Sequence, residues 1–298
     1  MDLFSHLIGA YANNTLRAYR ADFKVFKQWC DANQIDPLNS SPERVAEFVH
    51  YEAKSKSTAT IRRRIGSLSS LFKLNKLGDP TRSSEVVLAL KRIHRQKGRA
   101  QKQAYPLTRD LLDQLLNVCS DDLKGQRDRV MLLLGYETMR RRSELCTFRF
   151  EDIEFLPRGR TAIRLRFSKT DQYGEGKLLP ISDELVQAIQ NWKTMAGLEC
   201  GPILRGLTKN GGVRASLSPS HINLRLKELA SALSMHPSAH LSGHSFRVGA
   251  AIDLLEAGES LEKIMLRGEW QSEATAIRYL RSWWGCSMCS AKLITQNH

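Results

Sequence analysis

The chain is short of long hydrophobic runs, of clustered cysteines and of acidic residues. No apolar run approaches the roughly 20 residues that a membrane-spanning helix needs, so no membrane partner is expected. The first residues, Met-Asp-Leu-Phe-Ser-His, lack the basic and then apolar layout of a secretory signal peptide. The six cysteines are scattered over 298 residues, which argues against a disulfide-stapled fold. Together these absences indicate a reducing, cytoplasmic setting.

Metal ligands are scarce as well. Cys286 and Cys289 have the spacing of a zinc knuckle, but no second ligand pair lies near them, and a structural zinc ion usually takes four ligands. The sequence also lacks a local cluster of carboxylates like those that hold paired magnesium ions. We therefore predict no metal site.

The shortage of acidic residues gives the chain a strong positive charge. Lys and Arg number 45 against 31 for Asp and Glu, a net charge of +14, and the excess is concentrated in the first hundred residues. Such a balance favours a polyanionic partner, although solvated Lys and Arg faces are common in soluble proteins. The length suggests two domains, each able to bury its own core.

The first hundred residues are predicted to be helical. Apolar residues recur every three or four positions, and Ser41-Pro42 is an N-cap followed by proline at the first helical position. The predicted helices cover residues 14–31, 42–54, 61–72 and 84–94. The polar side of the third helix begins with Arg62, Arg63 and Arg64. Residues 91–102 then hold six basic residues and no acidic one, which is typical of a solvated linker and also of a segment that crosses a phosphate backbone.

The second part of the chain is predicted to be mostly helical with a small antiparallel sheet. Residues 160–167 alternate with period two, and turn residues at 168–176 separate them from a partner strand at 177–181. Helices are expected from Thr108 onward and over residues 125–138, 182–195, 219–234, 243–257, 260–267 and 271–282. The fold class is therefore mainly α with a small antiparallel β-sheet, in two domains.

Several residues have the chemistry of a phosphate site, although each has an ordinary structural explanation when it is considered alone. Arg140, Arg141 and Arg142 lie at the junction of two helices, where an arginine could bind a phosphate and Glu144 could orient it. His244 and Arg247 share one face at the start of a helix capped by Ser242 or Gly243. The remaining candidates are a lysine in the predicted hairpin, an indole donor and a phenol, namely Lys169, Trp270 and Tyr279.

In chain order these residues give the pattern Arg…Lys…His-x-x-Arg…Trp…Tyr, carried by Arg141, Lys169, His244, Arg247, Trp270 and Tyr279. With this pattern the sequence resembles the tyrosine recombinase (phage integrase) family. Gly-His-Ser-Phe-Arg-Val-Gly-Ala-Ala, with Trp at the fifth place, resembles its Cre-like branch. Residues 60–68 and 90–93 are similar to segments of the first domain of that branch, so the resemblance covers nearly the whole chain. Arg140 and Arg142 flank Arg141, so either could take its place. Some residues expected before the first long helix are missing.

The resemblance implies two domains that form a clamp round DNA. Residues 1–96 would be the helical core-binding domain, 97–106 the basic linker, and 107–298 the catalytic domain with a C-terminal tail. The residues expected to contact DNA are Arg62, Arg63, Arg64, Lys97, Arg99 and Lys102. By the same resemblance, four protomers would assemble on two copies of an inverted-repeat site. The apolar tail at residues 282–294 would pack on a neighbouring protomer or on its own domain. The setting would be the nucleoid.

The resemblance also implies a reaction. Tyr279 would attack the scissile phosphate, and Arg141 and Arg247 would hold its non-bridging oxygens, supported by Glu144. Lys169 would protonate the leaving 5′-oxygen, His244 would exchange a proton with the tyrosine or phosphate, and Trp270 would donate its N–H. The bond energy would be kept in a 3′-phosphotyrosine until a Holliday junction resolves, so neither metal, ATP nor another cofactor is implied. The rival readings are a type I topoisomerase, a DNA-binding protein with a decayed site, and, on charge alone, an RNA-binding protein.

Overall fold

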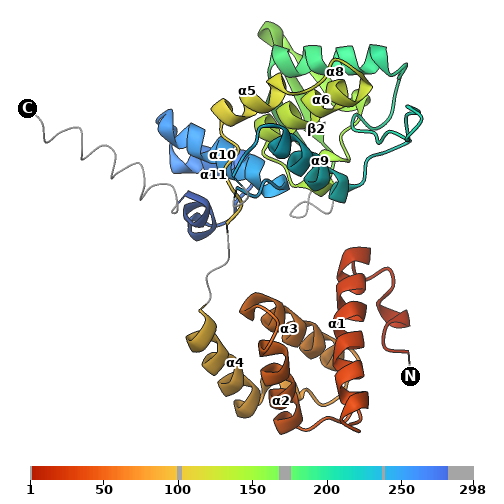
Figure 1. Ribbon diagram of the computed structural model, residues 1–298, viewed down its shortest axis with the longest axis vertical. Helices are drawn as coiled ribbons and strands as arrows, with labels where there is room; N and C mark the ends of the chain where they lie inside the picture. The colour runs from red at the N-terminus through yellow and green to blue at the C-terminus, as the bar shows by residue number, and fades with distance from the viewer. Residues whose placement is uncertain (1, 99–102, 168–175, 237–238, 281–298) are drawn as a thin grey trace, which may run out of the picture. The chain divides into compact units, whose positions relative to one another are not determined.

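The computed structural model describes residues 2–98, 103–167, 176–236 and 239–280. The chain divides into two compact units, Met1–Lys102 and Gln103–His298, and the division falls inside the segment that the sequence predicts as a linker. Helices dominate both units, and the second also contains a three-stranded antiparallel sheet (Figure 1). The predicted fold class, mainly α with a small antiparallel sheet, is confirmed.

The described part of the first unit is built from four α-helices, two of which have a serine hydroxyl as N-cap. The hydroxyl of Ser57 accepts a hydrogen bond from the Thr60 N–H, and that of Ser83 accepts one from the Val86 N–H, which satisfies donors left free at a helix start. The four helices are α1 (Asn13–Ala32), α2 (Pro42–Ala53), α3 (Thr58–Leu74) and α4 (Ser84–Lys97).

The core of this unit contains an aromatic cluster and, beside it, a buried carboxylate. The ring centroids of Phe26 and Phe48 are 5.0 Å apart, and both side chains are fully buried. Asp22 on α1 is 1% exposed and accepts a 2.8 Å hydrogen bond from the Ser67 hydroxyl on α3. A buried charge is costly unless it is paired, and two arginines of α3 provide the pairing.

The second unit combines α-helices with the small sheet in its described part. These helices are α5 (Arg109–Asn117), α6 (Leu123–Thr138), α7 (Arg142–Leu145), α8 (Asp183–Met195), α9 (Pro219–Ala232), α10 (Gly243–Glu256) and α11 (Leu261–Gly268). The strands are β1 (Ile153–Leu156), β2 (Arg160–Leu165) and β3 (Lys177–Ile181), paired in that order. Residues 273–280 are also helical. Two expected strands and the long helices are found. The helix expected after the three arginines, whose bounds were not predicted, is α7, whereas β1 was not predicted at all.

Helix α6 lies at the centre of this unit, where α8 and α10 pack on it (Figure 1). Two glycines allow the close approach of α10. A Cβ at Gly135 would lie 2.7 Å from the Phe246 ring, and a Cβ at Gly249 would lie 1.8 Å from the Leu107 carbonyl oxygen. Both distances are shorter than any real contact, so only glycine fits. Among the described helices, none is long and apolar enough to cross a membrane.

Candidate active site

Three consecutive arginines follow α6 and have different surroundings. Met139 ends the helix in the left-handed region, with φ of 53°, and so turns the chain out of the helix. Arg140 is then fully buried, Arg141 is half-buried and Arg142 is exposed. Only the middle arginine is both accessible and held in place, which makes it the best placed of the three to bind an anion.

Arg141 is the N-cap residue of α7 and is oriented by Glu144. Its backbone N–H donates to Glu144 Oε2 at 3.1 Å, and its guanidinium donates to Oε1 at 2.9 Å. Glu144 itself is 5% exposed. A carboxylate that binds both the main chain and the side chain of one arginine restricts its rotamers, so the guanidinium is held beside the helix start.

Helix α10 carries the His-x-x-Arg pair. Ser242 caps it, accepting a 3.3 Å hydrogen bond from the His244 N–H. Arg247 is 2% exposed and donates to two main-chain carbonyls, that of Met139 at 2.8 Å and that of Gly268 at 2.6 Å. Burial, and then the charges of Arg141 and Arg140, lower the pKa of Arg247 to about 10. The side chain is therefore still a cation at neutral pH.

Trp270 and Tyr279 complete a stack on this arginine. The Arg247 guanidinium carbon lies 5.2 Å from the centre of the Trp270 ring, within the range of a cation–π interaction. The ring centroids of Trp270 and Tyr279 are 5.1 Å apart with an interplanar angle of 25°. Gln103 fixes the backbone here by donating to the Tyr279 carbonyl at 2.6 Å. The phenol is thus held near a buried, positively charged guanidinium.

His244 lies at the start of α10 in a positive environment. Partial burial, followed by the charges of Arg247, Arg141 and Arg142, lowers its pKa below the ordinary value of 6.5. An imidazole with a lowered pKa is neutral at pH 7 and can accept a proton. His244 is exposed in the first turn of α10 and shares a helix face with Arg247 three positions on, and the preceding Gly243 packs against Arg142.

The structure therefore brings together Arg141, Glu144, His244, Arg247, Trp270 and Tyr279 from α7, α10 and the chain after α11. Lys169 and the C-terminal tail lie outside the described residues, so their predicted roles stay predictions. Within the described residues, no group of three or more His, Cys, Asp or Glu side chains is arranged to hold a metal ion.

The basic residues predicted to contact DNA in the first unit differ in their availability. Arg62 is exposed. Arg63 is half-exposed and ion-paired with Asp22, whereas Arg64 is 12% exposed and paired with Glu52. Lys97 donates to the main-chain carbonyls of Ala53 and Lys56. The last two predicted residues, Arg99 and Lys102, lie outside the described ranges.

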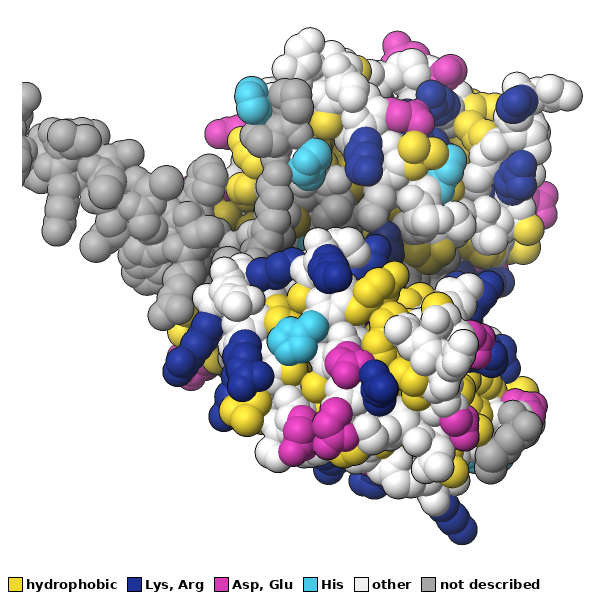
Figure 2. Space-filling model, turned by 60° about the horizontal axis from the view of Figure 1, so that its bottom comes forward, with side chains coloured by type: hydrophobic (Ala, Val, Ile, Leu, Met, Phe, Trp, Pro, Cys, Tyr) yellow, Lys and Arg dark blue, Asp and Glu magenta, His cyan; other side chains and the backbone are white. Residues whose placement is uncertain are grey.

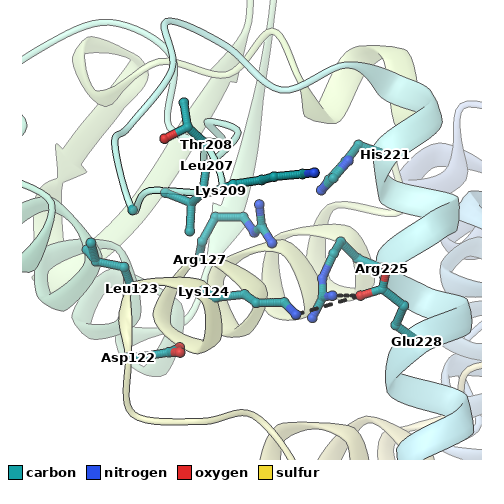
Figure 3. Close-up of a pocket in the computed structure, with 11 residues that line it drawn as sticks. Asp122, Leu123, Lys124, Arg127, Leu207, Thr208, Lys209, His221, Arg225 and Glu228 are labelled. Atoms are coloured by element: carbon teal, nitrogen blue, oxygen red, sulfur yellow. Dashed lines mark ion pairs between the residues drawn. The ribbon is translucent and has the colours of Figure 1, made fainter.

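On the face shown in Figure 2, Lys and Arg side chains are interspersed with acidic and uncharged ones. One basic pocket of about 590 Å³ lies between α6, α9 and the chain around residues 207–211. Figure 3 shows the side chains of Arg127, Lys209 and His221 pointing toward one another there, with Arg225 ion-paired to Glu228. Burial, and then Arg127 and Arg225, lower the pKa of His221.

Neither this pocket nor the hydrogen-bond and ion-pair partners of the arginines in the candidate site were predicted from the sequence. Arg127 and Arg225 both pair with the buried Asp128, at 2.8 Å and 2.6 Å, and Arg225 lies 97 positions along the chain from that carboxylate. No local pattern marks such a contact, because it depends on how α6 and α9 pack.

Comparisons with known proteins agree on one family. A family model described as the phage integrase family matches residues 105–283, and one described as the phage integrase N-terminal SAM-like domain matches residues 2–76. An integrase/recombinase xerD homolog of Selenomonas ruminantium is 30% identical over 90% of this chain and 82% of its own length. Recombinase cre of Escherichia phage P1 is 27% identical over 95% of this chain and 88% of its own.

The fold has solved counterparts as well. The Tn1549 transposon integrase, solved in complex with transposon right end DNA, superimposes with a TM-score of 0.68 at 18% identity, covering 93% of both chains. At this level of identity the likeness concerns the fold alone.

Proposed function

Because this chain belongs to the phage integrase family, we propose that it is a site-specific DNA recombinase that cuts and rejoins strands through a 3′-phosphotyrosine intermediate, without metal or ATP. The observation that carries this proposal is the stack of Arg247, Trp270 and Tyr279 beside Arg141. It offers a nucleophile, two phosphate-binding cations and an indole donor at one place.

In the proposed first step the Tyr279 oxygen attacks the scissile phosphorus and loses its proton to His244. The lowered pKa of His244 supports this role, since a neutral imidazole is required to accept a proton. The bond from phosphorus to the 5′-oxygen breaks, and Lys169 supplies the proton that makes this oxygen a free hydroxyl. The phosphotyrosine keeps the energy of the broken phosphodiester bond. A 5′-hydroxyl from a second duplex can therefore attack the phosphorus, release Tyr279 and seal the strand.

Arg141 and Arg247 bind the non-bridging oxygens of the phosphate in this mechanism. Negative charge on these oxygens grows in the transition state, and losing one preorganised donor typically costs about 2.7–4 kcal/mol of barrier. Trp270 donates its indole N–H to the phosphate and excludes water. Glu144 orients Arg141, a role supported by its two hydrogen bonds to that residue.

Double-stranded DNA with an inverted-repeat site is the proposed partner, held by a clamp of the two domains 1–96 and 107–298 with the basic linker 97–106 between them. The DNA named for the Tn1549 integrase complex supports this choice of partner. Arg62, exposed on α3, is the strongest candidate for a DNA contact in the first domain. Arg64 is better explained by its pairing with Glu52. We further propose a tetramer on two sites, a Holliday junction intermediate and association with the nucleoid.

A suicide substrate tests the proposed reaction. A duplex that the protein binds is selected from DNA flanking the gene and from a random library. It is then nicked near the cleavage point, so that the short strand released with the 5′-hydroxyl diffuses away and cannot be rejoined. The parent protein is expected to form a covalent adduct that Tyr279→Phe does not form. Tight binding with no adduct for the parent would identify a DNA-binding protein with a decayed site. A parent protein that forms the adduct and relaxes supercoiled DNA, but gives no Holliday junction products, would be a topoisomerase.

A further inference from the structure

Cationic side chains bind the C-terminal ends of α6 and α11, and two of them, Arg140 and Arg247, bind both ends. At the end of α6, the carbonyls of three successive residues accept hydrogen bonds from Arg267, Arg140 and Arg247. At the end of α11, the last three carbonyls accept from Lys177, Arg140 and Arg247. Carbonyls at a helix C-terminus lack partners within the helix and carry partial negative charge, so cations stabilise them.

Arg140 differs from the other cations because it is paired with an acid. It is 0% exposed, and its guanidinium donates to the Thr138 carbonyl at 2.8 Å and to the Arg267 carbonyl. Its remaining nitrogen lies 2.6 Å from Glu269 Oε2. Burial lowers the pKa of Arg140, and the charge of Glu269 opposes that shift.

Glu269 adopts an unusual backbone conformation to make this contact. It ends α11 in the left-handed region with φ of 50°, which disfavours a residue that has a Cβ. Its side chain is 14% exposed. A glycine would adopt this backbone without strain. Because glutamate does not, its strain must be offset by an interaction of its side chain, and the buried ion pair with Arg140 is that interaction.

The pair lies directly beside two residues of the proposed catalytic group. Arg141 follows Arg140, and Trp270 follows Glu269, while Arg247 bridges the same two segments through the carbonyls of Met139 and Gly268. A change in the separation of these segments therefore shifts Arg141, Arg247 and Trp270 relative to one another.

We propose that Arg140 and Glu269 are positioning residues, whose buried ion pair fixes the segment that leads into Arg141 against the segment that leads into Trp270. This inference rests on the proposed function, because the groups it aligns are those that bind the scissile phosphate. Neither residue touches the phosphate itself, so the pair acts on the rate of the chemical step and leaves DNA affinity unchanged.

If Arg140 and Glu269 served only the stability of the fold, their replacement would change stability but not the rate of the chemical step in a folded variant. Removing one partner of a buried pair leaves an uncompensated charge and destabilises the fold, whereas removing both is often neutral for stability. The double variant Arg140→Met/Glu269→Gln therefore separates folding from positioning. We expect its thermal midpoint to lie closer to that of the parent than the midpoint of either single variant.

The decisive measurement is the single-turnover rate of adduct formation on the nicked duplex, compared with the Kd for the same duplex. For the double variant we expect a Kd within about twofold of the parent and a rate about 100-fold lower, the size of effect that a misplacement of about 1 Å produces. The matched control Arg164→Met/Glu154→Gln removes a half-exposed pair between β1 and β2 and should react at the parent rate. A folded double variant that reacts at the parent rate, or a control that is slowed equally, overturns the inference.

A second variant keeps the test decisive if the double variant does not fold. Glu269→Asp retains the charge but is one methylene shorter, and it should slow adduct formation by about 10-fold at unchanged Kd. If this variant forms the adduct at the same rate as the parent protein, the positioning role of Glu269 is contradicted. If the parent itself forms no adduct, the proposed function fails and this inference fails with it. If the parent reacts and the variants match it, only the positioning role is wrong.

Discussion

At the scale of single residues, the burial of each arginine decides what its charge can do. Arg140 has no exposed surface, donates to two main-chain carbonyls and is ion-paired with Glu269. Arg141 keeps 27% of its side chain exposed while Glu144 holds it. Arg142 is exposed and raises the positive potential at His244. Within three positions, the guanidinium group is therefore buried in one residue, held in an accessible place in the next, and exposed near a histidine in the third.

His244 provides a pH-dependent prediction at this scale. In the DNA-free protein its titration midpoint, followed by NMR of the ring C–H signals and assigned with His244→Gln, should lie below 6.5. Arg142→Gln should raise that midpoint, because removing a positive charge favours the imidazolium form. The midpoint should nevertheless stay below 6.5, since burial is the largest cause of the shift. A midpoint above 6.5 in the parent would contradict the environment described for this residue.

The residues of the candidate site were predictable from the sequence because their order and spacing follow a family pattern. What could not be predicted was which groups hold them. Arg247 binds carbonyls that are 108 and 21 positions away in the chain. Main-chain carbonyls are present at every position, so no residue type in the sequence marks them. The burial of Arg140 follows a turn made by the left-handed backbone of Met139. A methionine in the sequence does not predict this conformation.

At the scale of elements, small residues set the position of α10, the helix that carries His244 and Arg247. Gly249 lets this helix contact the backbone before α5, where the Leu107 N–H donates to the Ser245 carbonyl at 3.0 Å. Asp253 adds a second attachment, since it accepts from the Tyr136 hydroxyl at 2.6 Å and from the Arg109 N–H at 2.8 Å. The site is therefore aligned by contacts of α10 with both α5 and α6.

Gly249→Ala tests this attachment. The added Cβ would overlap the Leu107 carbonyl, so α10 must shift, and we expect the free energy of unfolding of the second unit to fall by about 1–3 kcal/mol or more. Chemical denaturation followed by circular dichroism measures the change. The control Gly66→Ala lies in α3, where a Cβ would meet nothing within 4 Å, and should stabilise the first unit by about 0.5–1 kcal/mol. Unchanged stability of Gly249→Ala would show that the helix is not closely packed there.

The long elements were predictable because their periodicity is repeated. α6 spans Leu123–Thr138 and β3 spans Lys177–Ile181, close to the predicted 125–138 and 177–181. β1 was missed, and the helix after the three arginines was expected without bounds, because β1 and α7 have four residues each, too few to establish a period. β1 is recognised only through its pairing with β2, where Ile153 faces Ile163. Such a pairing is a tertiary property.

At the scale of the whole molecule, 45 Lys and Arg side chains outnumber 31 Asp and Glu side chains, which leaves a net charge of +14. Many basic side chains are already paired within the protein, as Arg63, Arg64 and Arg225 are. Only basic residues that are not already ion-paired displace counterions when DNA binds, so the number of phosphate contacts must be smaller than the total of 45 Lys and Arg side chains.

The salt dependence of DNA binding tests this view. Arg62→Gln should weaken binding and reduce the slope of log Kd against log salt by about 1, the value for one lost phosphate contact. Fluorescence anisotropy over a salt series measures the slope. The control Lys27→Gln removes an exposed lysine whose charge is already paired with Asp31 at 2.7 Å, and its slope should equal that of the parent. An equal slope for both variants would exclude Arg62 from the DNA contact.

The two carbonyls that hold Arg247 have an electrostatic consequence. A carboxylate partner would cancel the charge of this guanidinium, whereas carbonyl dipoles orient it and leave its formal charge intact. Among the residues that the structure describes, no carboxylate forms an ion pair with this buried cation. Under the proposed function, the scissile phosphate would supply that counterion, so that substrate binding would neutralise a charge buried in the free protein.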